Sequence, residues 1–106
     1  MWDQQWLEQF PQVKFEPDAA ILRIGTSVTY NYYLEEGLCA KMVYSSEGEE
    51  TVLRYYDPGE MLGIQLYRYG RESIFDFIAT TPCICRKIPS ELVQDQLKTN
   101  SAVCYG

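Results

Sequence analysis

The sequence contains no histidine, and this absence narrows the chemistry that the chain can perform. Histidine is the commonest metal ligand and the usual general base beside a serine or cysteine nucleophile. Without it, a histidine-based metal site and a Ser–His or Cys–His nucleophile pair are both excluded. We therefore expect no enzymatic activity, no metal ion and no other cofactor.

Long apolar runs are also missing from the chain. No run approaches the about 20 residues that a membrane-spanning helix needs, and no basic and apolar leader opens the sequence. We expect a cytoplasmic protein that makes no contact with a membrane. With 106 residues, 46% of them hydrophobic, the chain is long enough for one folded domain with a single core.

Basic residues are few: nine Lys and Arg stand against fifteen Asp and Glu, which gives a net charge of −6. Binding to nucleic acid requires positive charge concentrated against phosphates. The longest basic cluster is Arg86-Lys87. We therefore expect that this segment does not bind DNA by itself.

The four cysteines lack the two-residue CxxC spacing that is typical of zinc knuckles. Cys83 and Cys85 are separated by one residue in an expected strand, so their side chains share one face. Disulfide bonds are rare in the cytosol, and buried cysteines behave as small apolar residues. We interpret the cysteines as buried, inert thiols.

Short runs of aromatic and β-branched residues, separated by turns, predict a mainly β protein with antiparallel strands. The expected strands are residues 13–15, 19–24, 28–34, 38–45, 50–56, 73–79 and 84–88. Glycine and acidic residues at 36–37 and 46–49 predict two of the turns between them. This spacing favours an all-β sandwich or roll over parallel βαβ units.

Short helices are expected at both ends of this β region. Trp2, Trp6 and Phe10 recur at helical spacing, so we expect a helix over residues 2–10 within an N-terminal segment that ends at residue 12. These aromatic residues either cover an open end of the sheet or form an interface with a partner. A second helix is expected from Ser90 to about Thr99.

The stretch from Asp57 to Ala79 organises the remaining chain. Asp57-Pro58-Gly59 predicts a turn, and residues 61–69 predict a short buried helical segment that ends at Gly70. The strand at residues 73–79 follows. Together they predict the wall of a pocket in which backbone N–H groups and a few side chains meet a small ligand.

This stretch resembles the phosphate-binding cassette of cyclic-nucleotide-binding domains, as in the sensor half of CRP/FNR-type transcription regulators. Pro58, Gly59 and Gly63 match the family pattern, and the spacing of Gly25, Gly37 and Gly48 extends the resemblance over residues 13–98. The resemblance implies an antiparallel double-stranded β-helix, or jelly roll, with short flanking helices. The whole chain, residues 1–106, is then one sensor domain.

Two charged residues of the family pattern are replaced in this chain. The glutamate that holds the ribose hydroxyl falls on Ile64, and the arginine that neutralises the cyclic phosphate falls on Ser73. Arg71 lies two residues away, on the same face of an extended segment, and is a partial substitute. Because a buried phosphate needs a cationic partner, we expect an effector other than cAMP or cGMP.

The candidate pocket is expected to suit a flat apolar or aromatic molecule, such as an aromatic or apolar acid. Its candidate ligand-binding residues are Tyr55, Gly63, Ile64, Gln65, Tyr67, Arg71, Ser73, Ile74 and Phe75. The alternative hypothesis is a degenerate module that has lost its ligand and acts in protein interaction. Saturable binding of a small molecule separates the two hypotheses.

In CRP/FNR-type regulators a long dimerising helix and a helix-turn-helix domain follow this region. Neither is present in the sequence, so the chain is either a truncated regulator or a separately expressed sensor domain. The resemblance implies a homodimer for the full-length protein, with DNA bound only through the missing C-terminal domain. The segment alone is too short after Ser90 for a coiled coil of several heptads.

Overall fold

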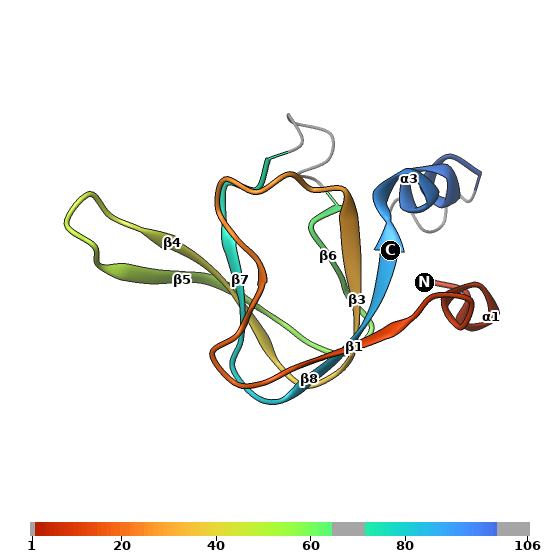
Figure 1. Ribbon diagram of the computed structural model, residues 1–106, viewed down its shortest axis with the longest axis horizontal. Helices are drawn as coiled ribbons and strands as arrows, with labels where there is room; N and C mark the ends of the chain where they lie inside the picture. Colours follow the sequence, from red (N-terminus) through yellow and green to blue (C-terminus); the bar gives the residue numbers. More distant parts are fainter. Residues whose placement is uncertain (1, 65–71, 100–106) are drawn as a thin grey trace.

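A computed structural model describes residues 2–64 and 72–99 of the chain. The elements, in chain order, are α1 (Gln4–Leu7), β1 (Gln12–Phe15), β2 (Ala20–Leu22), β3 (Tyr30–Glu36), β4 (Cys39–Tyr44), β5 (Glu50–Tyr56), β6 (Met61–Leu62), β7 (Asp76–Ala79), β8 (Cys83–Pro89) and α3 (Ser90–Thr99). Figure 1 shows these strands folded into a roll, with both helices at one end. The expected mainly β fold with short flanking helices is confirmed.

The described strands form two four-stranded sheets in which every named pair is antiparallel. Sheet A has the order β1-β8-β3-β6, and sheet B has the order β2-β7-β4-β5. Strands that are adjacent in a sheet are mostly distant in sequence, because successive strands alternate between the two sheets, except in the β4–β5 hairpin. This arrangement is the antiparallel jelly roll that the resemblance implies.

The main core lies between the two sheets. Leu34 and Cys85 from sheet A meet Cys39 and Phe77 from sheet B, and all four side chains are buried. Phe15 and Tyr32 extend this core with a ring pair whose centroids are 5.8 Å apart. The alternation of side chains along each strand places these residues on the inner faces.

A second core covers the outer face of sheet A. Leu7 from α1 and Val93 from α3 pack there on Ile88 of β8 and Met61 of β6, all of them buried. The rings of Trp2, Trp6 and Phe10 pack against this cluster. Of the two hypotheses for the N-terminal aromatic residues, the structure supports the one in which they cover a sheet.

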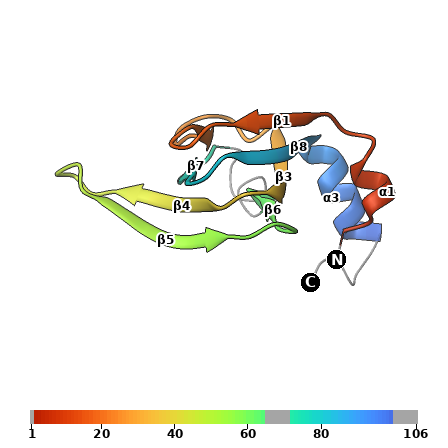
Figure 2. The ribbon, with the colours of Figure 1, turned by 90° about the horizontal axis from the view of Figure 1, so that it is seen from below.

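Sheet B has no comparable cover among the described residues. The β4–β5 hairpin projects from the end of the molecule opposite to α1 and α3, as Figures 1 and 2 show from two directions. Every residue of β5 except Tyr56 is exposed. The hairpin therefore forms an arm that extends beyond the two-layered part of the roll.

Several boundaries differ from the sequence-based prediction. The expected helix over residues 2–10 is α-helical only at Gln4–Leu7, because the Asp3 side chain accepts from the Gln5 N–H and starts the helix there. The turn that follows the helix is closed by a bond from the Phe10 N–H to the Leu7 carbonyl, which has i−3 spacing. The strand expected at 19–24 ends at Leu22, since the Ile24 N–H donates to the Asp76 carboxylate and not to a strand.

The helical prediction for residues 61–69 is wrong at its start. Met61 and Leu62 pair with Tyr33 and Tyr32 as strand β6, and a helical residue appears only at Ile64. Residues 65–69 lie outside the described residues. The strand expected from Ser73 begins at Asp76, because the Ser73 side chain bonds to the backbone of Phe75 and bends the chain.

Candidate functional site

The described part of the candidate pocket begins at Gly63, directly after β6. Its φ of +84° lies in the left-handed region, and a Cβ here would lie 2.9 Å from Leu22 Cδ1 and 3.1 Å from Asn31 Nδ2. Glycine is therefore required for its conformation and for its close packing. This packing fixes the start of the cassette against β2 and β3.

Asn31 of β3 forms a side-chain hydrogen bond to β6. It interrupts an otherwise apolar stretch of sequence. Its Nδ2 donates to the Leu62 carbonyl at 3.1 Å, and the side chain is completely buried. Its Oδ1 has no hydrogen-bond partner among the described residues. A buried amide with only one bond made lowers stability, but that bond sets the position of β6 and of Gly63 after it.

Ile64 is the residue that the sequence resemblance aligns with the family's ribose-binding glutamate, a correspondence that stays a prediction. Its side chain is half-buried and packs on the outer core of sheet A, which includes Met61, Ile88 and Val93. A hydrocarbon side chain in this place offers no acceptor for a hydroxyl group. The Ile64 side chain therefore joins the core formed with α1 and α3, and it supplies no charged group to a ligand.

Ser73 is the residue that the sequence resemblance aligns with the family's phosphate-binding arginine, which also stays a prediction, and only 2% of its surface is exposed. Its N–H donates to the Thr26 carbonyl at 2.9 Å, and its own carbonyl accepts from the Gly25 N–H at 2.8 Å. Its hydroxyl donates to the Phe75 carbonyl. The polar groups of Ser73 are thus engaged within the protein.

The other described candidate residues do not converge on one point. Ile74 is 62% exposed, whereas Phe75 is half-buried with the Lys41 ammonium 4.6 Å from its ring centroid. Tyr55 is 54% exposed and pairs with Ala40, so it lies on the face of sheet B opposite to that of Tyr56. Tyr55 is therefore directed away from the interior of the roll.

Three of the candidate residues, Gln65, Tyr67 and Arg71, lie outside the described residues. On both sides of this segment the chain is attached to the connection between β2 and β3. Gly63 packs on Leu22 at its start, and Ser73 bonds to Gly25 and Thr26 at its end. The two ends of the cassette are thus held by one short stretch of chain.

One cation on the inner face of sheet B, Arg54, is already paired with an anion. Arg54 forms an ion pair with Glu60 and lies 4.2 Å from the centroid of the Tyr56 ring. The Glu60 carboxylate also accepts from the Asp57 N–H at 2.8 Å, which closes the turn before β6. Arg54 therefore stabilises the turn that leads into the cassette.

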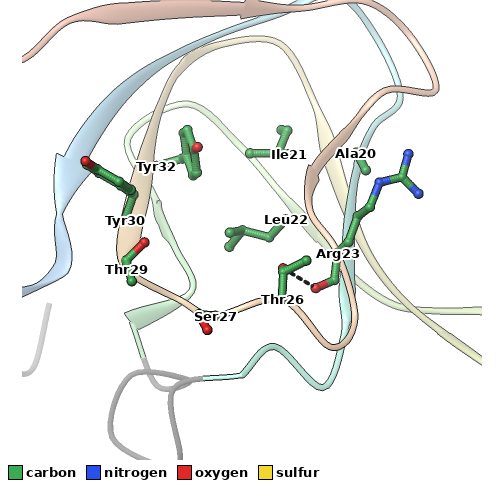
Figure 3. Close-up of a pocket in the computed structure, with 9 residues that line it drawn as sticks. All are labelled: Ala20, Ile21, Leu22, Arg23, Thr26, Ser27, Thr29, Tyr30 and Tyr32. Atoms are coloured by element: carbon green, nitrogen blue, oxygen red, sulfur yellow. Dashed lines mark hydrogen bonds between the residues drawn. The ribbon is translucent and has the colours of Figure 1, made fainter.

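A cavity of about 280 Å³ lies on the other side of Leu22, between β2 and the start of β3. Its lining residues are Ala20, Ile21, Leu22, Arg23, Thr26, Ser27, Thr29, Tyr30 and Tyr32. Figure 3 shows them around the opening, with the Arg23 guanidinium pointing away from it. The sequence-based analysis named none of these residues for the site.

The lining combines an apolar floor with hydroxyl groups. Burial raises the pKa of the Tyr32 phenol above its usual range, and the neighbouring Cys85 contributes to the shift, so this hydroxyl stays protonated at neutral pH. The Lys87 ammonium lies 4.3 Å from the Tyr30 ring centroid and supplies positive charge beside the cavity. The available sequence signal was the run Thr26-Ser27-Val28-Thr29-Tyr30, whose hydroxyl groups cluster before a strand.

Three of the four cysteines are described, and the prediction that these thiols are buried is confirmed. Burial raises the pKa of Cys39 and of Cys85 to about 12, and it also raises the pKa of Cys83. A protonated thiol is a poor nucleophile and a poor metal ligand. Cys104 lies outside the described residues.

The family model of the cyclic nucleotide-binding domain matches residues 12–100. Since this match covers most of the sequence, the chain belongs to the cyclic nucleotide-binding domain family. Among curated protein sequences, none matches the chain. In the described residues, no helix is long and apolar enough to cross a membrane.

Solved structures with the same fold include transcription regulators of the CRP/FNR type. A transcriptional regulator from Thermotoga maritima gives a TM-score of 0.83 at 14% identity, over 99% of this chain and 82% of its own. The sensor domain of DNR from Pseudomonas aeruginosa gives 0.79 at 18%, over 93% and 67%.

The c-di-GMP-responsive regulator CLP from Xanthomonas campestris also gives a TM-score of 0.79, at 20% identity. The match covers 93% of this chain but only 48% of CLP. The chain therefore spans about half the length of CLP and corresponds to one part of it. At these identities the three structures establish the fold.

Proposed function

We propose that this chain is the effector-sensing domain of a CRP/FNR-type transcription regulator. The observation that carries the proposal is the match of the family model over residues 12–100, together with the fold that the chain shares with the DNR sensor domain. The proposed role is regulatory and not catalytic. The full-length protein is then a cytoplasmic homodimer that binds DNA through a C-terminal domain outside this sequence.

The effector is not a cyclic nucleotide in this proposal. Ile64 packs on apolar side chains, and the polar groups of Ser73 are bonded within the protein, so neither position offers the partner that a cyclic nucleotide needs. Losing one charge-assisted contact to the phosphate costs about 1.5–3 kcal/mol. The unpaired anion adds a further desolvation penalty.

A small aromatic or apolar acid fits the roll better. Aromatic side chains surround its interior, including Tyr32, Tyr56, Phe75 and Phe77. Such rings bind a flat molecule through apolar contact and offset stacking. Two ammonium groups, that of Lys41 beside Phe75 and that of Lys87 beside Tyr30, supply partners for a carboxylate.

Isothermal titration calorimetry on the chain tests this proposal, with cAMP and cGMP in one arm and 4-hydroxybenzoate, benzoate and phenylacetate in the other. We expect saturable binding in the second arm and no saturable heat with the cyclic nucleotides. Micromolar binding of cAMP contradicts the choice of effector. A gel shift at low salt is expected to give no retarded band with the chain alone, because its net charge is −6.

A second candidate function is protein interaction without a ligand. The outer face of sheet B favours it, because Tyr44, Val52 and Tyr55 are exposed there on the projecting hairpin and β5 is an edge strand. Edge strands pair readily with added strands. Absence of saturable heat with every acid, combined with slowed hydrogen exchange of the β5 amides in the full-length protein, supports this candidate over the sensor.

A further inference from the structure

The wall of the cavity is the connection from Arg23 to Thr29, which joins β2 to β3. Figure 3 shows this connection passing below the opening, with Leu22 and Tyr32 across from it. The Thr26 hydroxyl donates to the Arg23 carbonyl at 2.7 Å and holds the connection in a tight turn. A molecule in the cavity therefore touches a stretch of chain whose shape is set by a few hydrogen bonds.

The same connection holds the segment that follows the cassette. The Ser73 N–H bonds to the Thr26 carbonyl, the Gly25 N–H bonds to the Ser73 carbonyl, and Ser27 forms a β-bridge with Glu72. The Ile24 N–H donates to the Asp76 carboxylate at 2.7 Å. A shift of the connection therefore moves residues 72–76 with it.

The connection also holds the first residue of α3. The Ser90 N–H donates to the Thr29 carbonyl at 3.0 Å, and the Ser90 hydroxyl donates to the Val28 carbonyl at 3.3 Å. Ser90 and Val28 are both almost completely buried, so these bonds are shielded from water. One short stretch of chain thus contacts the cavity, the end of the cassette and the start of α3.

We propose that this cavity is an effector site for a small ring carboxylate that carries a hydroxyl group, and that residues 23–29 transmit its occupancy to α3. The inference rests on the proposed sensor function and names its site and ligand class. The apolar floor of Ile21 and Leu22 accepts the ring, and the hydroxyls of Thr29 and Tyr32 bond to the ligand hydroxyl. The Lys87 ammonium, beside Tyr30, pairs with the carboxylate.

The volume agrees with this ligand class. At about 280 Å³ the cavity is just below the range of about 300–1,000 Å³ that is usual for small-molecule sites. This volume admits one ring with its substituents, above the apolar side chains of Ile21 and Leu22.

Titration of the isotope-labelled chain with 4-hydroxybenzoate, followed by backbone NMR, tests the site directly. We expect saturable shifts in the amides of Thr26–Tyr32 and, through the Thr29 bond, in those of Ser90 and its neighbours. Benzoate, which lacks the hydroxyl, is expected to bind more weakly. The Cys39–Tyr44 amides on the far sheet serve as the internal reference.

Filling the cavity gives the decisive variant. Thr29→Phe places a ring in the opening and removes no side-chain hydrogen bond, because only the backbone carbonyl of Thr29 holds Ser90. We expect binding to weaken by more than about tenfold, which corresponds to a loss of about 1.4 kcal/mol. Thr51→Phe, at another exposed threonine on β5, is the matched control and is expected to bind as the unmodified chain does.

The charge contact has its own test. Lys87→Gln is expected to weaken the binding of 4-hydroxybenzoate by about two- to fivefold, the size expected for a partly exposed ion pair. The binding of the neutral 4-hydroxybenzamide is expected to stay unchanged. Lys98→Gln, at an exposed lysine of α3, is the control for net charge. If Lys87→Gln weakens the binding of 4-hydroxybenzoate and of 4-hydroxybenzamide equally, Lys87 does not pair with the carboxylate.

The outcomes separate this inference from the proposed function. Saturable shifts confined to residues 61–64 and 72–75 overturn the cavity as the site and leave the sensor function standing. Shifts in Thr26–Tyr32 without any in α3 support a binding site but contradict a sensor that acts through this helix. Absence of saturable shifts with 4-hydroxybenzoate, or unchanged binding in Thr29→Phe, overturns the inference.

Discussion

The two sheets of the roll follow the same alternation of side chains but have different surroundings. Sheet A is covered on its inner face by the main core and on its outer face by Leu7 and Val93 of the two helices. Sheet B is covered on its inner face, and its outer face carries exposed Tyr55 and Val52. The same strand pattern therefore gives a doubly buried sheet in one place and a half-exposed one in the other.

This difference predicts which sheet contributes more to the stability of the protein and which one tolerates substitutions. Strands β3 and β8 in the interior of sheet A contribute side chains to both cores, whereas β5 at the edge of sheet B contributes one buried residue, Tyr56. Local stability follows buried apolar contact. We expect substitutions in sheet A to cost more than matched substitutions in sheet B.

The largest contrast is expected for a pair of leucines. Leu34 on β3 is completely buried, and Leu34→Ala is expected to lower the free energy of unfolding by about 2–5 kcal/mol. Leu53 on β5 is 49% exposed, and Leu53→Ala is expected to change it by at most about 0.5 kcal/mol. Urea unfolding of both variants measures the difference, and equal losses contradict the comparison.

Two glycines give the next contrast. Gly37, between β3 and β4, has a φ of +99°, and a Cβ there would lie 2.4 Å from the Pro82 carbonyl oxygen, so Gly37→Ala is expected to cost about 3 kcal/mol. Gly48, at the tip of the hairpin, has a φ of +85° and open space around it. Gly48→Ala is then expected to cost only the conformational strain, about 1–2 kcal/mol. Thermal unfolding ranks the two variants.

Two arginine ion pairs sharpen the comparison further. Arg86 of sheet A pairs with Glu35 and also donates to the Phe10 carbonyl at 2.8 Å, with side-chain exposures of 17% and 15% for the pair. Arg86→Met removes the cation beside the Glu35 carboxylate, which keeps the Gln12 amide as a donor, and removes one bond to the N-terminal segment, at a cost of about 1–3 kcal/mol.

The control is the ion pair of sheet B, where Arg54 and Glu60 are 53% and 33% exposed. Arg54→Met is expected to cost less than about 1 kcal/mol. Urea unfolding at low and high salt checks both values, because screening weakens the exposed pair more. A larger loss for Arg54→Met contradicts the proposed order.

The effect that is smallest at neutral pH, and that appears only at alkaline pH, concerns the core that the two sheets share. Cys39 of sheet B and Cys85 of sheet A each have a pKa of about 12 in the folded state, against 9.0 for an ordinary thiol. The folded state keeps protons that the unfolded state loses, so the contribution of these two thiols to stability is constant below about pH 9 and falls as the pH rises toward 12.

Unfolding free energies measured between pH 8 and pH 10.5 test this dependence. Tyr32 and Tyr56 also have raised pKa values and add to the decline at alkaline pH. We therefore compare the slope of the unmodified chain with those of Cys39→Ala and Cys85→Ala. Each variant is expected to reduce the slope of the unfolding free energy against pH by a similar amount. A reduction in only one variant contradicts the burial of both thiols in one core.

The fold was largely predictable because its signals are local. Turn residues separate the strands, and the five glycines of the framework, Gly25, Gly37, Gly48, Gly59 and Gly63, all have positive φ. Strand ends were less predictable, because they depend on distant partners. β2 ends where the Asp76 carboxylate captures the Ile24 N–H, and no pattern near Ile24 indicates that contact.

The candidate site was predicted less completely. Gly63 and Ser73 were named from their places in the cassette, and the structure attaches both to the chain between Leu22 and Thr26. Tyr55 was named as a nearby aromatic, but its face is set by its register with Ala40 and points outward. Register is a property of the pair of strands and cannot be obtained from the tyrosine alone.

The order of strands in the two sheets has a consequence for the synthesis of the protein. β7 and β8 are the last strands made, yet each lies in the interior of its sheet, where β8 joins β1 to β3 and β7 joins β2 to β4. Until these strands leave the ribosome, β1 and β2 have none of their partners in the sheets. Neither sheet can therefore close before residues 76–89 are made, and until then the apolar faces of the earlier strands stay exposed to aggregation.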